Sequence, residues 1–297
     1  MQTGTKSTLA KLSKTYELLK KEAAVDAQSA KVAKLLVQLV IAALDFLSLR
    51  CVSVPLTSKV PAKAYFSFAV RGKSGKISRP INKSLFDLDC RDKLKHLLQG
   101  TFEKVPPAER ERLLYTIAMS YCCATDLLKE GDQKTPATFF ECLIGHLLVR
   151  VLGVNPRTQV EVLRLEEEAS TLPTDLIFDL GSGKPKFHVP VKISTRERVI
   201  QVFAHQRVLN GVLGYGSFRG VLVCLTETKL DHQNREVIEI CLPKQWNLYQ
   251  RFIAPMHRFY YFDVPKKYEA LAGGDPPMAV TNFSKFFDEV RDLTAGR

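Results

Sequence analysis

The sequence predicts an α/β protein with a mixed central sheet flanked by helices, preceded by helical N-terminal elements. Three observations support this class: a helix-rich first half, a block of strand patterns after it, and a helix followed by a fully apolar strand. The helical patterns cover residues 6–49, 89–98, 107–128, 136–152 and 195–213. The strand patterns cover residues 159–165, 174–180, 186–193 and 220–226. This order predicts a helical region with short strands over residues 1–105 and a core over residues 106–297.

Other segments complete this prediction. Short strands are expected at residues 51–56 and 64–70, and helices at 243–252 and 282–293. The apolar run over residues 35–49 is short and contains Gln38 and Asp45. It therefore predicts a packed helix and not a membrane span.

Composition and charge narrow the function. The chain has 297 residues, 45% hydrophobic and 25% charged, as in ordinary globular proteins, which excludes intrinsic disorder. A formal net charge of +12 and a pI near 9.3 favour a polyanionic partner, nucleic acid before an anionic membrane. A protein that is merely basic fits the charge as well, so the motifs must decide.

The cysteines indicate the compartment. There are seven, with Cys122 and Cys123 adjacent and no C-x2-C pair, which predicts a reducing environment and no structural zinc site. We expect them to act as small hydrophobic residues. The N-terminal residues lack a cationic head followed by an apolar core and a cleavage site, so no secretory signal is expected.

A predicted hairpin brings an acid and a lysine together. Asp175 lies in the apolar segment Asp-Leu-Ile-Phe-Asp-Leu, which ends at Gly181-Ser182-Gly183, and residues 187–193 form the returning strand. Asp175 and Lys192 should then lie a few ångströms apart. A carboxylate there can hold a divalent metal, and an ammonium can steady a water or a phosphate oxygen. A lone pair of this kind is more often structural, so its surroundings matter.

With these residues the chain resembles the PD-(D/E)xK nucleases. The residues after Lys192 resemble, more narrowly, the type II restriction endonucleases that recognise CCGG or CCNGG. In that group the catalytic lysine precedes an R-(D/E)-R cluster that reads C:G pairs, which Arg196, Glu197 and Arg198 match here. The likeness covers roughly residues 136–226, and the rest of the chain has no match.

The second acid of such a site departs from the family's pattern. In the family this acid usually stands two positions before the lysine, and in the CCGG group it commonly stands fourteen positions after it. Here the first position holds Pro190, which can bind no metal, and the second holds Gln206, which brings no charge. Asp179 shares a strand face with Asp175 by the two-residue period. We favour Glu141, in the preceding apolar helix, because a buried acid needs a partner and because this fold often supplies a metal-side glutamate from that helix. Gln206 would give only polar help.

The Arg-Glu-Arg cluster has two interpretations. Ser194 followed by Glu197 is a capping-box pattern, which would explain the glutamate alone. The two arginines would remain unexplained, since the first turn of a helix disfavours cations unless a polyanion is near. Arginine bonds guanine in bidentate fashion and glutamate accepts from cytosine, so the triplet suits consecutive C:G pairs. We favour base reading. His205, in the same helix, could line the site.

The resemblance implies a Mg²⁺-dependent type II restriction endonuclease that cuts double-stranded DNA at a palindrome with a CCGG core. As part of restriction-modification it would act in the cytoplasm of a prokaryotic cell, as a homodimer or higher homo-oligomer, without a membrane partner. The apolar helix at residues 107–128 is our first candidate for the dimer interface, and the extra N-terminal helix is the second. A structure-specific repair or recombination nuclease, or a non-catalytic DNA-binding module of the same fold, remains an alternative.

Overall fold

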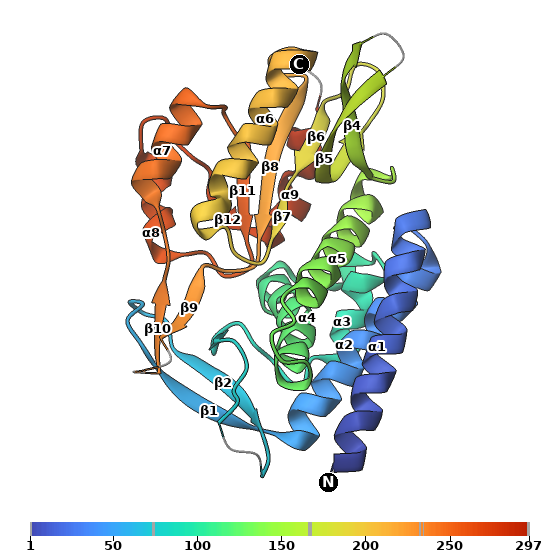
Figure 1. Ribbon diagram of the computed structural model, residues 1–297, viewed down its shortest axis with the longest axis vertical. Coiled ribbons are helices and arrows are strands. Elements are labelled where there is room, and N and C mark those ends of the chain that lie inside the picture. The colour runs from blue at the N-terminus through green and yellow to red at the C-terminus, as the bar shows by residue number, and fades with distance from the viewer. Residues whose placement is uncertain (1, 73–74, 166–167, 232, 234, 296–297) are drawn as a thin grey trace. The chain divides into compact units, whose positions relative to one another are not determined.

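The computed structural model describes residues 2–72, 75–165, 168–231, 233 and 235–295, which divide into two compact units (Figure 1). The first unit comprises Met1–Arg150 and Thr228–Glu239, and the second comprises Val151–Glu227 and Ile240–Arg297. The sequence prediction placed a boundary after residue 105, whereas the compact units divide after Arg150. Residues 106–150 belong with the N-terminal helices because their apolar faces pack there.

The helices of the first unit are α1 (Gln2–Val25), α2 (Ala30–Arg50), α3 (Arg91–Leu98), α4 (Pro107–Leu128) and α5 (Lys134–Leu152). The single helix predicted over residues 6–49 is wrong, because the chain turns between α1 and α2. Asp26 Oδ1 accepts from the Gln28 N–H at 3.0 Å, and Ser29 caps α2 by accepting from the Val32 N–H at 3.2 Å. Short polar side chains of this kind favour caps and turns over helix interiors.

Several of these helices are core helices. Among the described residues, α2 and α5 have the length and apolar composition of membrane spans, yet 56% and 61% of their apolar windows are buried inside the structure. The packed helix predicted around residues 35–49 agrees with this. Most of α4 from Leu113 to Leu127 is also buried, so this helix offers little apolar surface to a partner.

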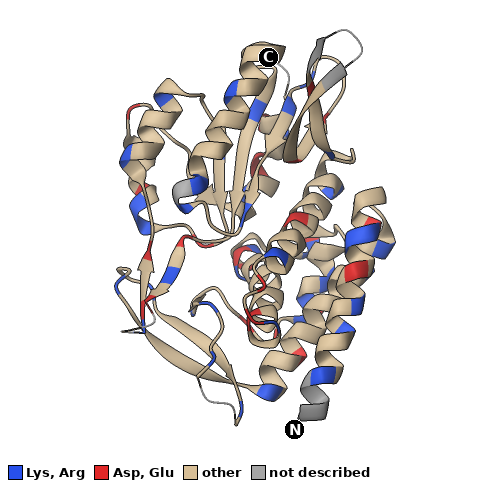
Figure 2. Ribbon diagram, in the orientation of Figure 1, with Lys and Arg blue, Asp and Glu red and all other residues tan. Residues whose placement is uncertain are grey.

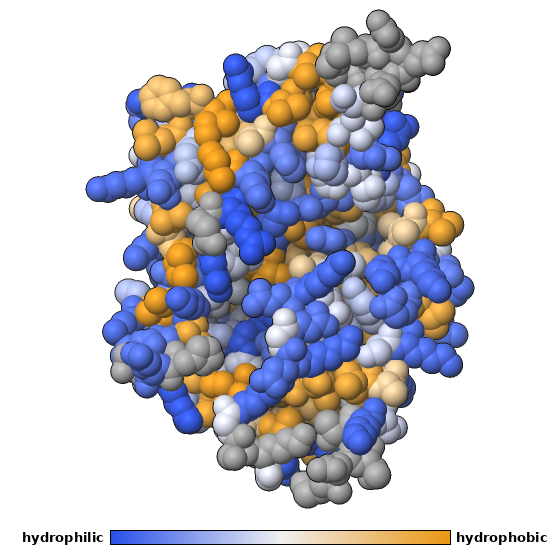
Figure 3. Space-filling view, viewed as in Figure 1, coloured by the Kyte–Doolittle hydropathy of each residue, from blue (hydrophilic) through white to orange (hydrophobic). Residues whose placement is uncertain are grey.

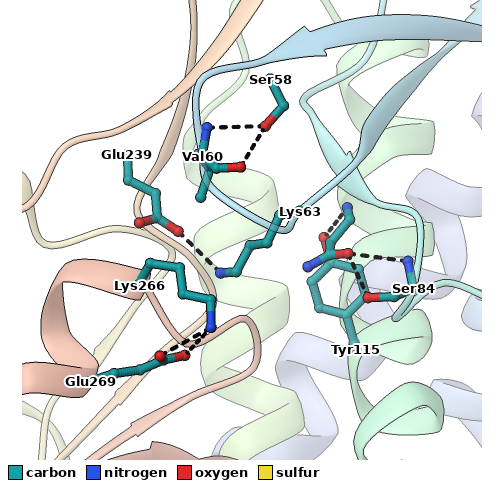
Figure 4. Close-up of polar contacts among 9 residues, drawn as sticks. Ser58, Val60, Lys63, Ser84, Tyr115, Glu239, Lys266 and Glu269 are labelled. Carbon is teal, nitrogen blue, oxygen red and sulfur yellow. Dashed lines mark hydrogen bonds and ion pairs between the residues drawn. The ribbon is translucent and has the colours of Figure 1, made fainter.

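A small sheet completes the first unit. Within the described residues its order is β3 (Ile81–Asn82), β2 (Tyr65–Val70), β1 (Cys51–Ser58), β10 (Glu236–Glu239) and β9 (Thr228–Asp231). The predicted strands at residues 51–56 and 64–70 are confirmed as β1 and β2. A buried ion pair, with Lys63 Nζ 3.0 Å from Glu239 Oε1, ties β10 to the loop after β1 (Figure 4).

The second unit holds the mixed sheet that the sequence predicted. Its described strands run in the order β12 (Val280–Asn282), β11 (Arg258–Tyr261), β8 (Phe218–Cys224), β6 (Lys186–Val189), β5 (Glu168–Asp179) and β4 (Arg157–Leu165), with β7 (Val191–Lys192) also paired to β8. The pairs β4–β5 and β5–β6 are antiparallel, while β6, β7 and β11 run parallel to β8 and β12 runs parallel to β11. The helices are α6 (Val199–Leu213), α7 (Pro243–Phe252), α8 (Lys266–Glu269) and α9 (Phe286–Thr294).

The two faces of this sheet are separated by the two-residue period of its strands. Leu222 of β8 and Tyr261 of β11 belong to a core cluster with Phe203 of α6 and Trp246 of α7. On the other face, Tyr260 packs edge-on against Phe286 of α9, with ring centroids 5.9 Å apart. Central strands covered on both sides are apolar throughout, which is why residues 220–226 appear in the sequence as a continuous apolar run.

The surface carries its positive charge in a dispersed way. Lys and Arg are spread over the helices and strands of both units (Figure 2). The face drawn in Figure 3 is largely hydrophilic with apolar residues between. On α6 the exposed apolar residues are Ile200, Val208, Val212 and Leu213, each between 36% and 48% exposed.

We predict that Asp126→Ala destabilises the first unit. Asp126 of α4 accepts from the Nε, Nη2 and backbone N–H of Arg79 at 2.8, 2.8 and 2.9 Å, and both side chains are about four-fifths buried. Removal of the carboxylate leaves a largely buried guanidinium without its partner, so the free energy of unfolding should fall by about 3 kcal/mol, measured by urea denaturation. Asp92→Ala is the control, since its fully exposed carboxylate lies 3.6 Å from Lys95 and its loss should leave the free energy of unfolding essentially unchanged. Equal losses in the two variants would contradict the prediction.

Candidate active site

Asp175 and Lys192 are in contact, as the predicted hairpin requires. β5 and β6 pair from Asp179 opposite Lys186 to Leu176 opposite Val189, and Pro190 then stands next to Asp175 without an N–H to donate. Asp175 Oδ2 accepts instead from the Val191 N–H at 2.7 Å and from Lys192 Nζ at 2.6 Å. The carboxylate thus bridges the end of one strand and the start of the next.

The second oxygen of Asp175 is available. In the part of the chain that the structure describes, Asp175 Oδ1 makes no hydrogen bond, and the side chains of Asp175 and Lys192 are 21% and 30% exposed. Both residues line a cavity of about 160 Å³ with His188, His205 and Gln201 among the other lining residues. A carboxylate oxygen facing such a cavity is a suitable ligand for a hard cation.

Gln206 lies behind the cavity and reaches it through His188. Its Nε2 donates to Phe218 O and to Asn210 Oδ1, both at 3.0 Å, and its Oε1 lies 3.0 Å from His188 Nδ1. Gly220 makes room for this amide, because a Cβ there would lie 2.7 Å from Gln206 Oε1. The amide is therefore fully engaged in positioning the histidine, a role that the sequence did not suggest.

The two histidines of the cavity differ in burial. His188 is fully buried on β6, and burial lowers its pKa to about 4, against the opposing effects of the Gln206 hydrogen bond and the Asp175 charge. Its ring is therefore neutral at neutral pH. His205 of α6 is half-buried, burial also lowers its pKa, and its ring centroid lies 6.3 Å from that of His188. The sequence predicted that His205 could line the site, and His205 does line this cavity, whereas no role was assigned to His188.

Glu227 is a buried carboxylate that sequence reasoning missed. It follows β8, is fully buried and accepts hydrogen bonds from Ser194 Oγ at 2.9 Å, from the Thr195 N–H at 2.9 Å and from Tyr261 Oη at 3.0 Å. The Arg196 N–H also donates to it at 3.3 Å. A buried charge with this many donors is well satisfied, and here it fixes the backbone that leads from Lys192 to the arginine cluster. Its partners lie some thirty residues away in the sequence, so no local motif indicates its role.

The arginine cluster forms the 3₁₀ helix η2 (Arg196–Arg198), which leads into α6. Arg196 has a φ of +42°, a backbone conformation that non-glycine residues rarely adopt and that surrounding contacts must stabilise. Its side chain and that of Arg198 are exposed and make no ion pair with any described residue, while the side chain of Glu197 lies outside the described residues. Ser194 donates to Glu227, and the cap residue of η2, Thr195, makes no side-chain cap bond, so the capping interpretation has no support from Ser194.

The two candidates for the second acid are placed differently. Asp179 lies four residues along β5 from Asp175, about 13 Å at the usual strand rise, and pairs with Lys186 at 2.8 Å. One ion could not be shared by both aspartates over that distance. Glu141 lies on α5 of the first unit, and its role at the metal stays a prediction.

The described residues hold no cluster of three or more His, Cys, Asp or Glu side chains arranged for a metal ion. A divalent cation would therefore have Asp175 and few other protein ligands. Mg²⁺ is commonly held in this way, by one or two carboxylates together with water and substrate phosphates. The free oxygen of Asp175 and the polar atoms around the cavity fit such an ion.

Two solved structures resemble this chain. The type IIP restriction endonuclease Kpn2I matches with a TM-score of 0.77 at 23% sequence identity, over 96% of this chain and 99% of its own. A complex of the restriction endonuclease PspGI with substrate DNA matches with a TM-score of 0.41 at 15% identity, over 67% of this chain and 78% of its own. No family model and no curated protein matches the sequence. The first likeness shows that the chain has the fold of a restriction endonuclease.

We predict that Glu227→Gln loosens residues 194–198. An amide offers one acceptor oxygen and one NH₂ donor group in place of two acceptor oxygens, so some of the N–H and O–H groups that now meet the carboxylate would face another donor. Hydrogen exchange in this segment should accelerate, and the free energy of unfolding should fall by about 2–3 kcal/mol. Tyr261→Phe removes one neutral donor only, so about 1 kcal/mol is expected for it, with little change in exchange. Unchanged exchange in the glutamine variant would show that the carboxylate does not order the segment.

Proposed function

We propose that the chain is a type II restriction endonuclease that makes Mg²⁺-dependent, sequence-specific double-strand breaks in DNA at a palindrome with a CCGG core. The observation that carries the proposal is the contact of Asp175 Oδ2 with Lys192 Nζ, at 2.6 Å, beside a cavity and four residues from an arginine cluster. The fold shared with Kpn2I and the net charge of +12 support it.

Asp175 and Lys192 would have different catalytic roles. A divalent cation held at this site would supply positive charge to the scissile phosphate and would lower the pKa of a water beside it. Asp175 would hold this ion through Oδ1, the oxygen that makes no hydrogen bond in the described structure. Lys192 is already fixed by Oδ2, and its ammonium stabilises negative charge on a phosphate oxygen within the cavity. Glu141 remains our candidate for the second carboxylate.

The arginine cluster reads the bases. Arg196 and Arg198 of η2 are exposed and make no ion pair with a described residue, and two guanidiniums of this kind suit bidentate bonds to guanine O6 and N7. Glu197 would accept from cytosine N4. The strained Arg196 backbone, held by Glu227, fixes the direction in which the cluster leaves the sheet. Such preorganisation reduces the entropy lost on binding.

A palindromic target calls for a two-fold symmetric homodimer, since one chain offers one arginine cluster and one Asp–Lys pair. Our first candidate for the interface, residues 107–128, is disfavoured because α4 is largely buried. The exposed apolar residues of α6, including Val208 and Val212, offer surface in the same unit as the site.

A non-catalytic DNA-binding module is the second candidate. It is favoured by Pro190 and Gln206 at the positions of the family's second acid, and by the lack of a three-group metal cluster among the described residues. Both proposals predict specific binding, and only the first predicts metal-dependent cuts. Digestion of a plasmid into discrete fragments, followed by sequencing of the ends, separates them and gives the target.

We predict that Asp175→Asn and Lys192→Met abolish cleavage and preserve binding. Each removes a charge that acts on the metal or the phosphate, so the cleavage rate should fall at least about 100-fold while affinity for the target changes little. Lys186→Met is the matched control, because Lys186 forms the same kind of pair with Asp179 in the same hairpin and should cut normally. A near wild-type cleavage rate in either site variant would show that the active site lies elsewhere.

Sedimentation of these variants bound to DNA tests the homodimer, because it gives the number of chains per duplex.

We also predict that Arg196→Ala and Arg198→Ala relax base discrimination. Loss of a bidentate guanine contact should cost about 1–3 kcal/mol of preference for the C:G core, measured by competition between cognate and substituted duplexes. Arg207→Ala, an exposed arginine further along α6, is the control and should leave the preference unchanged. Uniform weakening on every duplex would make Arg196 and Arg198 phosphate contacts.

A further inference from the structure

We propose that His188 binds the same divalent cation as Asp175, through Nε2. This inference rests on the proposed function, because it concerns the ion of the same site. It begins from a buried atom that lacks a partner. His188 is fully buried, and its Nε2 makes no hydrogen bond to any residue that the structure describes. An unsatisfied buried polar atom is costly and calls for an explanation such as a bound ion or water.

The hydrogen bonds around Gln206 determine which nitrogen of His188 carries the proton. Phe218 O can only accept, so the amide nitrogen of Gln206 must point to it and the amide oxygen must point to His188. His188 Nδ1 is therefore the donor, and in a neutral ring Nε2 keeps its lone pair. A lone pair fixed by a hydrogen bond at the other nitrogen is the usual arrangement of a metal-binding histidine.

The position of the ring fits this role. His188 pairs with Gly220 and Lys192 with Cys224 in the parallel ladder to β8, so both side chains share the sheet face that α6 covers. His188 and Asp175 line the same cavity. Pro190, the position of the missing acid, lies between His188 and Lys192 along the chain and also lines it. His188 is two residues before Pro190 on the same strand face, and its imidazole reaches the cavity from there.

A second atom without a partner supports a hydrated ion in this cavity. Thr174 Oγ1 is buried, makes no hydrogen bond to a described residue and belongs to a residue that lines the cavity. A hydroxyl can bond a water in the coordination shell of an ion that has few protein ligands. Gln206 acquires a function as well: it replaces a family acid in the sequence and acts by orienting the ligand.

The ligand chemistry gives a preference among metals. An imidazole nitrogen binds transition metals better than Mg²⁺, which strongly prefers oxygen ligands. We therefore expect the site to bind Mn²⁺ more tightly than Mg²⁺, and His188→Asn to weaken Mn²⁺ binding at least about 10-fold.

The test uses Mn²⁺ on the intact protein without DNA. Electron spin-echo spectra of bound Mn²⁺ should show modulation from a directly bonded nitrogen, and its pattern should change when the protein carries ¹⁵N-histidine. The modulation should persist in His205→Asn, which removes the other histidine of the cavity. It should be lost in His188→Asn, and Asp175→Asn should weaken Mn²⁺ binding itself. Should His188→Asn fail to fold, the labelled wild type and the His205 and Asp175 variants still identify the ligand, because His188 is then the histidine that remains at this cavity.

Cleavage is measured separately, so that the two proposals can fail separately. An enzyme that cuts DNA while its bound Mn²⁺ shows no histidine nitrogen would overturn the role of His188 and leave the nuclease function intact. Nitrogen modulation that disappears in His205→Asn would assign the ligand to His205 and also overturn the inference. A protein that binds Mn²⁺ through a histidine nitrogen but never cuts would support the ligand and contradict the nuclease.

Discussion

One oxygen atom, Asp175 Oδ2, organises the end of the second unit that carries the candidate site. Pro190 has no N–H and ends the ladder between β5 and β6, so the next backbone donor, Val191, turns to this side chain. β7 can then leave β5 and remain paired with β8. The same oxygen accepts from Lys192, so the bond that redirects the strand also fixes the ammonium. Architecture and chemistry depend here on the same carboxylate.

Two buried polar networks support this centre from the sides. Gln206 orients His188 on the side of α6, and Glu227 holds residues 194–196 at the end of β8. Both networks are well satisfied within the described residues except at His188 Nε2 and the nearby Thr174 Oγ1. Fully paired buried groups rigidify a site, whereas an unpaired one calls for an explanation such as a bound ion or water.

The hairpin, the helix after it and the pairing of Asp175 with Lys192 could be predicted from the sequence, because strand period and turn residues act locally. The break at residues 26–29 was missed because apolar spacing continues on both sides of it. Glu227 could not be found, since its donors lie about thirty residues away and only the parallel alignment of β7 with β8 brings them together. Gln206, on α6, was noticed for the charge it lacks, but its orienting role requires Phe218 O and Gly220, which belong to β8. The division into two compact units could not be predicted, because helical patterns do not reveal which apolar faces meet.

The way the chain is shared between the units has a consequence for biosynthesis. The hairpin of β9 and β10 leaves the second unit after Glu227 and returns at Ile240, whose N–H donates to Glu227 O at 2.9 Å. Lys63 and its partner Glu239 are 176 residues apart in the sequence. Most strands of the second unit's sheet are therefore synthesised before β9 and β10 can complete the small sheet of the first unit. Neither unit is then a segment that could be cut out, exchanged or inherited as one continuous stretch. Long-range closure of this kind slows folding and exposes unpaired strand edges during synthesis.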